Sequence, residues 1–127
     1  MMGRVLLADD DEQVRRALGN SLTRAGFEVT AVDDGAPAIA LAETVLFDIV
    51  IADLNMKKVG GVAVIEHFKR RFGMGVCCVV LSGEDDETTA TLCYAAGADD
   101  VITKPTTPSE LRQRLFTAVR ALRGNAA

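Results

Sequence analysis

The sequence contains no long apolar run. A helix that crosses a membrane needs ~20 consecutive apolar residues, and no segment of this chain approaches that length. The N-terminal Met-Met-Gly-Arg is too brief for a signal peptide, and the apolar run after it leads directly into an acidic cluster. We therefore expect a cytoplasmic protein with no membrane partner.

Cysteine and histidine are scarce, with three cysteines and one histidine in the chain. Cys77 and Cys78 are adjacent, so in a strand their side chains point to opposite faces and cannot bind one metal ion together. Cys93 stands alone in a helical segment, and we interpret all three as small core residues kept reduced. His67 lies off the apolar face of its helix, which predicts a solvated residue rather than a phosphotransfer histidine or a metal ligand.

The chain also lacks a basic stripe. Its formal net charge is −4 and its basic residues are dispersed along helical segments, which argues against nucleic acid as a direct partner. A length of 127 residues suits a single domain with one core. We place this domain at residues 1–123. We expect residues 124–127 to be a frayed tail of a chain that either stands alone or was cut from a longer protein.

Short apolar runs alternate with segments of helical periodicity. Runs rich in branched residues that stop at polar residues predict buried parallel strands at 4–8, 27–32, 49–52, 76–81 and 101–102. Apolar residues at helical spacing predict helices near 14–25, 37–45, 62–72, 86–96 and 108–122. This alternation predicts an α/β fold, with a doubly wound parallel sheet of five strands, commonly in the order 2-1-3-4-5, and five helices.

Charged and hydroxyl side chains stand where the predicted strands end. In sheets of this kind ligands bind outside the carboxyl ends of the strands, at the point where the strand order reverses, here between the first and third strands. The side chains that we expect to converge there are Asp9, Asp10, Asp53, Ser82 and Lys104.

This set of side chains could perform phosphoryl transfer. Three carboxylates and one ammonium leave two negative charges uncompensated, which one Mg²⁺ would balance. Asp53 can act as a nucleophile, with Lys104 stabilising the added charge and Ser82 donating a hydrogen bond. Taken singly these residues indicate less, because Asp9 and Asp10 are about as well explained as acids at a helix N-terminus, and Asp53 as the start of a turn.

Four short motifs together resemble a known family. They are Leu7-Ala8-Asp9-Asp10-Asp11, Asp53-Leu54-Asn55-Met56, Leu81-Ser82-Gly83 and Thr103-Lys104-Pro105. With these motifs the chain resembles a response-regulator receiver domain of two-component signal transduction, similar to chemotaxis regulators, over nearly its whole length. The resemblance implies the flavodoxin-like receiver fold. It also implies a regulatory phosphoacceptor rather than an enzyme, with only self-catalysed phosphotransfer and dephosphorylation.

The resemblance gives the strand-end residues specific roles. Asp53 would be phosphorylated from a phosphohistidine on a sensor kinase or a histidine phosphotransfer protein. Ser82 would follow the phosphoryl group as a switch residue, Lys104 would pair with it, and the peptide bond before Pro105 would be cis.

A metal site is also implied by the resemblance. Mg²⁺, or Mn²⁺ in its place, would be held by Asp10, Asp53 and the backbone carbonyl of Asn55, with Asp9 acting through water. The side chains of Asn55 and Glu84 stand where family members adjust the access of water to the phosphorylated aspartate.

Three positions depart from the family pattern. Val101 occupies the place of an aromatic switch residue, Thr106 that of a common phenylalanine and Lys57 that of a common proline. Valine lacks the bulk for a large rotamer switch. We therefore predict that phosphorylation occurs, but that the shift across the fourth helix, fifth strand and fifth helix is smaller or differently shaped.

Other functions compete with a phosphorylation switch. The three departures would suit a degenerate receiver that acts as an interaction module independently of phosphorylation. A phosphatase with a strand-end aspartate nucleophile would need an acid two residues later, where this chain has Asn55. A flavin-binding protein would need a glycine- and hydroxyl-rich phosphate loop after the first strand, where carboxylates would repel the phosphate. We further expect a downstream output domain or protein partner, and a homodimer through the fourth helix, fifth strand and fifth helix.

Overall fold

The computed structural model describes residues 2–126, with side chains as far as Ala121. Within this part of the chain five strands alternate with five α-helices, and a short 3-10 helix, η1 (Gly73–Gly75), follows the third α-helix. The strands are β1 (Gly3–Ala8), β2 (Phe27–Val32), β3 (Ile49–Asp53), β4 (Cys77–Ser82) and β5 (Asp100–Thr103). The helices are α1 (Glu12–Arg24), α2 (Gly35–Leu41), α3 (Gly61–Phe72), α4 (Glu87–Ala96) and α5 (Pro108–Ala126).

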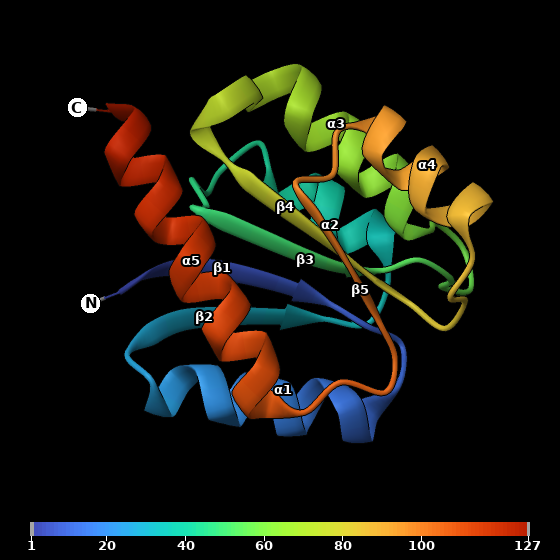
Figure 1. Ribbon diagram of the computed structural model, residues 1–127, viewed down its shortest axis with the longest axis horizontal. Coiled ribbons are helices and arrows are strands. Elements are labelled where there is room, and N and C mark those ends of the chain that lie inside the picture. The colour runs from blue at the N-terminus through green and yellow to red at the C-terminus, as the bar shows by residue number, and fades with distance from the viewer. Residues whose placement is uncertain (1, 127) are drawn as a thin grey trace.

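The strands form one parallel sheet in the order β2-β1-β3-β4-β5, which confirms the predicted fold class (Figure 1). The strand order reverses at β1, which pairs with both β2 and β3, and Ala8 at the end of β1 lies in register with Ala52 of β3. In Figure 1 the arrowheads of β1 and β2 point to the right, whereas the last turns of α5 lie at the left. The carboxyl ends of the strands therefore share the edge of the sheet that lies away from the end of α5.

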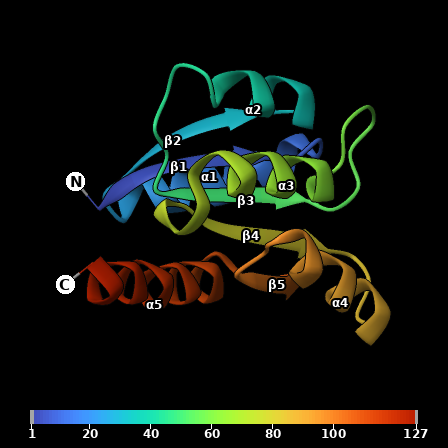
Figure 2. The same cartoon turned by 90° about the horizontal axis from the view of Figure 1, so that it is seen from above.

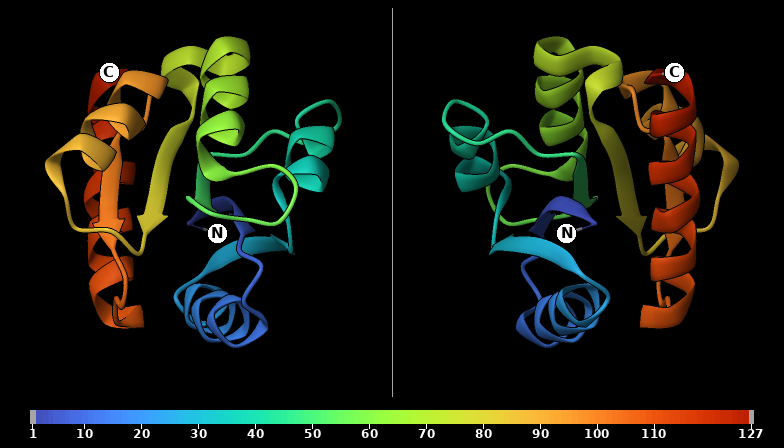
Figure 3. Two further views of the ribbon diagram at one scale, coloured as in Figure 1. Left: turned by 90° about the vertical axis from the view of Figure 1, so that its right-hand side faces the viewer. Right: turned by 90° about the vertical axis from the view of Figure 1, so that its left-hand side faces the viewer.

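Helices cover both faces of the sheet. Two apolar clusters show that α1 and α5 pack on one face, and that α2, α3 and α4 pack on the other (Figures 2 and 3). The residues of β3 divide between these clusters, with Ile49 and Ile51 toward α1 and α5 and Val50 and Ala52 toward α2 and α3. Both β3 and β4 are buried along their whole length. This explains why their sequences are continuous apolar runs rather than alternating ones.

Acidic residues begin three of the helices. Asp11, Asp34 and Asp86 are the N-caps of α1, α2 and α4, and each carboxylate accepts backbone N–H bonds from the first turn. The second helix is shorter than predicted, because α2 ends at Leu41 and a turn follows. In this turn the N–H of Val45 still donates to the Leu41 carbonyl at 2.9 Å, and Val45 packs against the core. The apolar spacing therefore continued past the end of the regular helix.

The last helix, α5, continues to Ala126, past Arg123, where the sequence placed the end of the domain. The sequence predicted a tail at residues 124–127. The structure does not describe the side chains of these residues, and Ala127 lies wholly outside the described part of the chain. Of the helices described, none is long and apolar enough to cross a membrane.

The cysteines are core residues, as predicted. Cys77 and Cys78 belong to opposite apolar clusters, and all three cysteines, including Cys93, are buried free thiols. Burial raises the pKa of Cys77 and of Cys78 to about 12, so both stay protonated at neutral pH.

The prediction of a solvated His67 was wrong. The residue is half-buried, and its buried Nε2 atom has no hydrogen-bond partner among the described residues. Its ring lies edge-on to that of Phe68, with 6.0 Å between the centroids. A large ring beside a buried aromatic side chain is partly covered even when its Cα lies off the apolar face of the helix.

Candidate functional site

Three carboxylates meet at the carboxyl edge of the sheet. Asp9 and Asp10 follow β1, and Asp53 is the last residue of the neighbouring strand β3. Asp9 is fully buried, Asp53 is 7% exposed and Asp10 is exposed. One oxygen of each carboxylate lies within 4.8 Å of the corresponding oxygens of the other two. The parallel pairing of β1 with β3 thus brings together acids that stand far apart in the sequence.

Lys104 completes the cluster from the other side. It follows β5, and its Nζ lies 3.1 Å from Asp9 Oδ2 and 3.1 Å from Asp53 Oδ2. Its backbone N–H donates to the Ser82 carbonyl at 2.7 Å, and the peptide bond between Lys104 and Pro105 is cis. One ammonium group therefore forms ion pairs with two buried carboxylates.

Burial and charge act against each other in this cluster. Burial raises the pKa of Asp53 above its ordinary value; the Asp9 carboxylate adds to this effect, and the hydrogen bond and charge of Lys104 oppose it. Burial disfavours the charged form of Lys104, but the neighbouring carboxylates of Asp53 and Asp9 outweigh this effect, and the pKa of Lys104 is raised. Lys104 is thus firmly protonated, yet it does not fully compensate the carboxylates around it.

The oxygen donors of the cluster fit a hard divalent cation. Mg²⁺ is usually held by one or two carboxylates together with water molecules. Asp9 Oδ2 is buried and, among the described residues, accepts no hydrogen bond of good geometry, although Lys104 Nζ lies 3.1 Å away. Because a buried carboxylate oxygen with an ion-pair contact but no hydrogen bond of good geometry is incompletely satisfied, Asp9 is suited to bind a further cation or its water, beside Asp10 and Asp53.

Ser82 is buried at the end of β4. Within the described residues its hydroxyl bonds the following loop, donating to the Glu84 carbonyl and accepting from the Glu84 N–H, both at 3.0 Å. The sequence predicted that Ser82 lies at this edge, and its strand does end there. The sequence did not indicate that its hydroxyl forms hydrogen bonds with the loop that leads to α4.

Sequence reasoning missed the role of Asp34. Its carboxylate caps α2 by accepting from the Ala36 N–H at 3.2 Å, and it also accepts from the N–H groups of Lys58 at 3.0 Å and Val59 at 3.2 Å. The bond from Lys58 is the main cause of the lowered pKa of Asp34, which burial opposes. Asp34 thereby fastens the loop that carries Asn55. An aspartate after a strand signals a helix cap, but nothing local signals a contact with a loop so distant in the sequence.

Comparison with known proteins decides the family. The sequence profile described as "Response regulator receiver domain" matches residues 5–116. The chain belongs to this family. It is 36% identical over 119 residues to the transcriptional regulatory protein KdpE of Mycobacterium tuberculosis, covering 94% of this chain and 52% of that protein. It is 31% identical over 120 residues to the alkaline phosphatase synthesis transcriptional regulatory protein PhoP of Bacillus subtilis, covering 94% and 50%.

A solved structure agrees with this assignment. The chemotaxis response regulator CheY4 of Vibrio cholerae aligns with a TM-score of 0.86 and 28% sequence identity, covering 93% of this chain and 99% of that one. The receiver domain described here spans about half the length of the two curated relatives.

The three departures from the family pattern lie on the surface or at its margin. Val101 in β5 is half-buried and packs against the apolar cluster on the α3 and α4 face. The Thr106 hydroxyl donates to Glu110 Oε2 at 3.3 Å. Lys57 is exposed and lines a hollow beside Asp10. A valine in this half-buried place has one stiff side-chain torsion and no ring that could swing between solvent and core.

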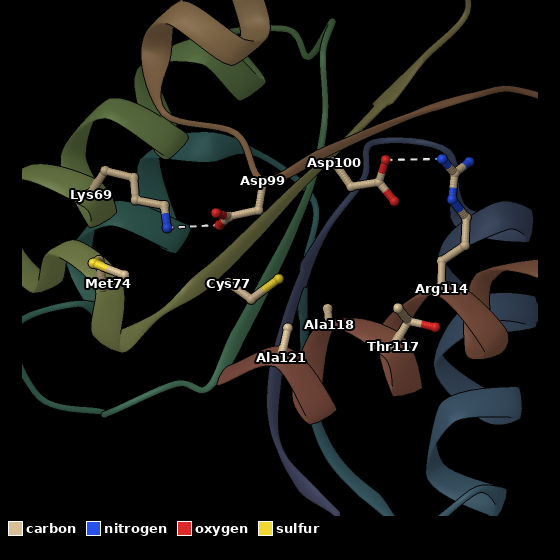
Figure 4. Close-up of a pocket in the computed structure, with 9 residues that line it drawn as sticks. All are labelled: Lys69, Met74, Cys77, Asp99, Asp100, Arg114, Thr117, Ala118 and Ala121. Carbon is tan, nitrogen blue, oxygen red and sulfur yellow. Dashed lines mark hydrogen bonds and ion pairs between the residues drawn. The ribbon is translucent and has the colours of Figure 1, made fainter. Parts of the chain in front are cut away.

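A second hollow, of about 350 Å³, lies beside α5 near the amino ends of β4 and β5 (Figure 4). Two ion pairs frame it: Lys69 Nζ lies 2.7 Å from Asp99 Oδ2, and Arg114 Nη2 lies 2.9 Å from Asp100 Oδ1. Each carboxylate here has a cation of its own, and the Cys77 thiol between them is protonated. The charged side chains that line this hollow are therefore all paired with one another, unlike the carboxylates at the other edge of the sheet.

Proposed function

We propose that Asp53 accepts a phosphoryl group from the phosphohistidine of a sensor histidine kinase or a histidine phosphotransfer protein. The observation that carries this proposal is the sharing of one ammonium, Lys104, between the buried carboxylates of Asp9 and Asp53, with Asp10 beside them. A phosphoacceptor site needs a carboxylate nucleophile and a local excess of negative charge that a divalent cation can balance. The buried carboxylate of Asp53 and the excess of negative charge around it, at one edge of the sheet, support the proposal.

The transfer step is a displacement at phosphorus. A carboxylate oxygen of Asp53 forms the new O–P bond while the P–N bond to the donor imidazole breaks, and that electron pair stays on the imidazole nitrogen. The charge at Asp53 grows from −1 to roughly −2. The ammonium of Lys104 is held 3.1 Å from Asp53 before the reaction, so it is placed to stabilise this added charge without a large rearrangement.

Mg²⁺ or Mn²⁺ is the cation that the donor set suits. Asp10, Asp53 and the Asn55 carbonyl would bind it, and Asp9 would act through water. When bound, it would neutralise carboxylates that otherwise repel one another and the incoming phosphoryl group. The Asn55 N–H donates a long bond of 3.4 Å to Asp53 Oδ1, which supports a loop already folded back toward the carboxylate.

Ser82 would report the phosphorylation. To donate to a phosphoryl oxygen its hydroxyl must give up the bond that it donates to the Glu84 carbonyl, which would loosen the loop before α4. Thr106 and Val101 would shape how far this change travels. Side chains at Asn55 and Glu84 would control the attack of water on the aspartyl phosphate, and this self-dephosphorylation is the only turnover that we propose.

The phosphorylated domain would regulate an output domain or a separate protein, and a homodimer through α4, β5 and α5 is part of the same proposal. Two relatives that are named as transcriptional regulators are about twice as long as this chain, which supports an output domain elsewhere in the protein. A cytoplasmic location is supported by three buried thiols that form no disulfide. We propose no direct contact with nucleic acid or membrane for this domain.

The experiment that tests this function is incubation with acetyl phosphate and Mg²⁺, followed by intact-mass measurement. The wild type should gain the mass of one phosphoryl group, and Asp53→Ala should gain none. The second candidate, an interaction module independent of phosphorylation, is favoured by Val101 in place of the aromatic switch. It predicts no gain for either protein.

A further inference from the structure

Asp10 is the exposed member of the carboxylate cluster. Within the described residues its carboxylate forms no ion pair, whereas Asp9 and Asp53 share Lys104. The direction of its side chain must therefore come from the backbone on either side. Because Asp10 is flanked by two peptide groups, fixing the planes of both fixes where its Cα–Cβ bond points.

Each of these two peptide groups is held by a side chain. The Asp9 carbonyl, which belongs to the peptide between Asp9 and Asp10, accepts a 2.8 Å hydrogen bond from Arg15 Nη1. The Asp11 N–H, which belongs to the peptide between Asp10 and Asp11, donates 2.9 Å to Asp9 Oδ1. Asp10 thus lies between two fixed planes, although its own carboxylate is free to bind a ligand.

The anchor for the first plane is itself well fixed. Arg15 lies in α1, half-buried, and its N–H donates to the Asp11 carbonyl at 2.9 Å. Asp11 caps the same helix by accepting from the N–H groups of Gln13 and Val14. The loop from Asp9 to Asp11 is therefore tied to α1 at both its side chains and its backbone.

We propose that Arg15 is a positioning residue that orients Asp10 toward the divalent cation by holding the peptide plane before it. This inference rests on the proposed function, because it assigns Arg15 a role at the same metal site. Arg15 touches neither the cation nor the phosphoryl group in this scheme and acts only through the Asp9 carbonyl.

Charge and position predict opposite effects for this arginine, which makes the proposal testable. If Arg15 acted only as a positive charge near three carboxylates, its removal would strengthen Mg²⁺ binding. If it holds the peptide plane, its removal weakens binding. Groups that orient metal ligands typically contribute about 10-fold to 100-fold in affinity, and we expect the lower end for Arg15→Ala.

Arg16 supplies a matched control. It has the same charge in the same helix, but it pairs with Glu12 at 3.3 Å and its side chain is 75% exposed. The experiment compares wild type, Arg15→Ala, Arg15→Lys and Arg16→Ala by calorimetric titration with MgCl₂. It also measures the ¹⁵N order parameter of the Asp10 amide in the metal-free proteins, because this N–H belongs to the peptide that Arg15 holds.

We expect Arg15→Ala to bind Mg²⁺ about 10-fold more weakly, with a lower order parameter at the Asp10 amide. Arg15→Lys should recover part of both, since lysine can donate one hydrogen bond, and Arg16→Ala should match the wild type. Unchanged or tighter binding by Arg15→Ala, or an unchanged order parameter, would overturn the proposal. A wild type that binds no Mg²⁺ would instead overturn the metal site of the proposed function, and the Asp10 order parameter would still decide what Arg15 does.

Discussion

The two ends of the sheet treat charge in opposite ways. At the carboxyl edge Asp9 and Asp53 share the single ammonium of Lys104. At the amino edge the carboxylates around the hollow in Figure 4 each have a cation of their own. An acid paired with its own base stabilises the fold but has no charge left for a ligand. Buried acids that outnumber their bases are stabilised by binding another cation. This imbalance of charge distinguishes the carboxyl edge, at which we propose phosphorylation, from the amino edge.

The largest expected effect separates the two lysines. Lys104→Met should slow phosphorylation by acetyl phosphate by about 100-fold, because it removes the one donor aimed at the developing charge. Lys69→Met removes a cation that pairs with Asp99 at the other end and should leave the rate unchanged. Both variants keep the apolar stem of the side chain, and a time course of intact mass measures both. If both variants were phosphorylated equally slowly, the charge imbalance at the carboxyl edge would not explain the reaction.

Neutralising one acid at each end should change stability in opposite directions. Asp53→Asn should raise the free energy of unfolding in the absence of Mg²⁺ by about 1 kcal/mol, because one of two buried acids that share an ammonium is removed. Asp99→Asn should lower it by up to about 1 kcal/mol, since it weakens an ion pair that is partly screened by solvent. Urea denaturation measures both. Destabilisation by Asp53→Asn would contradict this account.

The stability difference between the wild type and Asp53→Asn should depend on pH, and the raised pKa of Asp53 gives the sign of this dependence. The pKa of Asp53 is raised in the folded protein, so the folded state holds this proton more tightly than the unfolded chain does. The stability that Asp53 contributes is fully present below its unfolded pKa of about 3.9 and is lost as pH rises through its folded pKa. The free energy of unfolding of the wild type relative to Asp53→Asn should therefore fall as pH rises.

Asp34 provides an internal control for that measurement. Its pKa is lowered, chiefly by the backbone bond from Lys58, so its contribution is present above its unfolded pKa and is lost as pH falls through its folded pKa. The free energy of unfolding of the wild type, relative to that of Asp34→Asn, should therefore fall as the pH is lowered. Denaturation curves over a pH series, without Mg²⁺, test both signs, and slopes of the same sign for the two residues would refute the assignment.

The smallest expected effect concerns the signal that leaves the site. With beryllofluoride and Mg²⁺ as a mimic of phosphorylation, amide chemical shifts in α4 and β5 should change little in the wild type, because Val101 provides no ring to rearrange. Val101→Tyr should enlarge these changes. A wild type that already shifts as much as Val101→Tyr would mean that valine transmits the change by another route.

The sequence was sufficient to predict the edge of the site but not its internal bonds. Parallel strands run in one direction, so residues such as Asp9, Asp53 and Lys104, which stand at strand ends, meet at one edge whatever the details of the loops. The alternation of apolar runs and helices predicted a parallel sheet, because periodicity is recorded directly in a single sequence. The strand order was predicted only as the common order for five-stranded sheets of this kind, and the structure confirms it.

The missed features depend on side-chain direction. The Ser82 hydroxyl could have bonded either the carboxylates or the Glu84 backbone, and the sequence does not indicate which of the two it bonds. Asp34 contacts a loop 24 residues away in the chain, and Arg15 bonds a carbonyl rather than a carboxylate. Each depends on how loops lie in space, which a pattern of residue types does not specify.

The chemical location of the phosphoryl group tests directly whether Asp53 is the phosphoacceptor. After reaction with acetyl phosphate and Mg²⁺, borohydride reduces an aspartyl phosphate to homoserine, and fragment mass spectrometry locates the converted residue. We expect homoserine at position 53 alone, and none when Mg²⁺ is omitted. Conversion at another aspartate, or no conversion in a folded protein that binds Mg²⁺, would contradict this expectation.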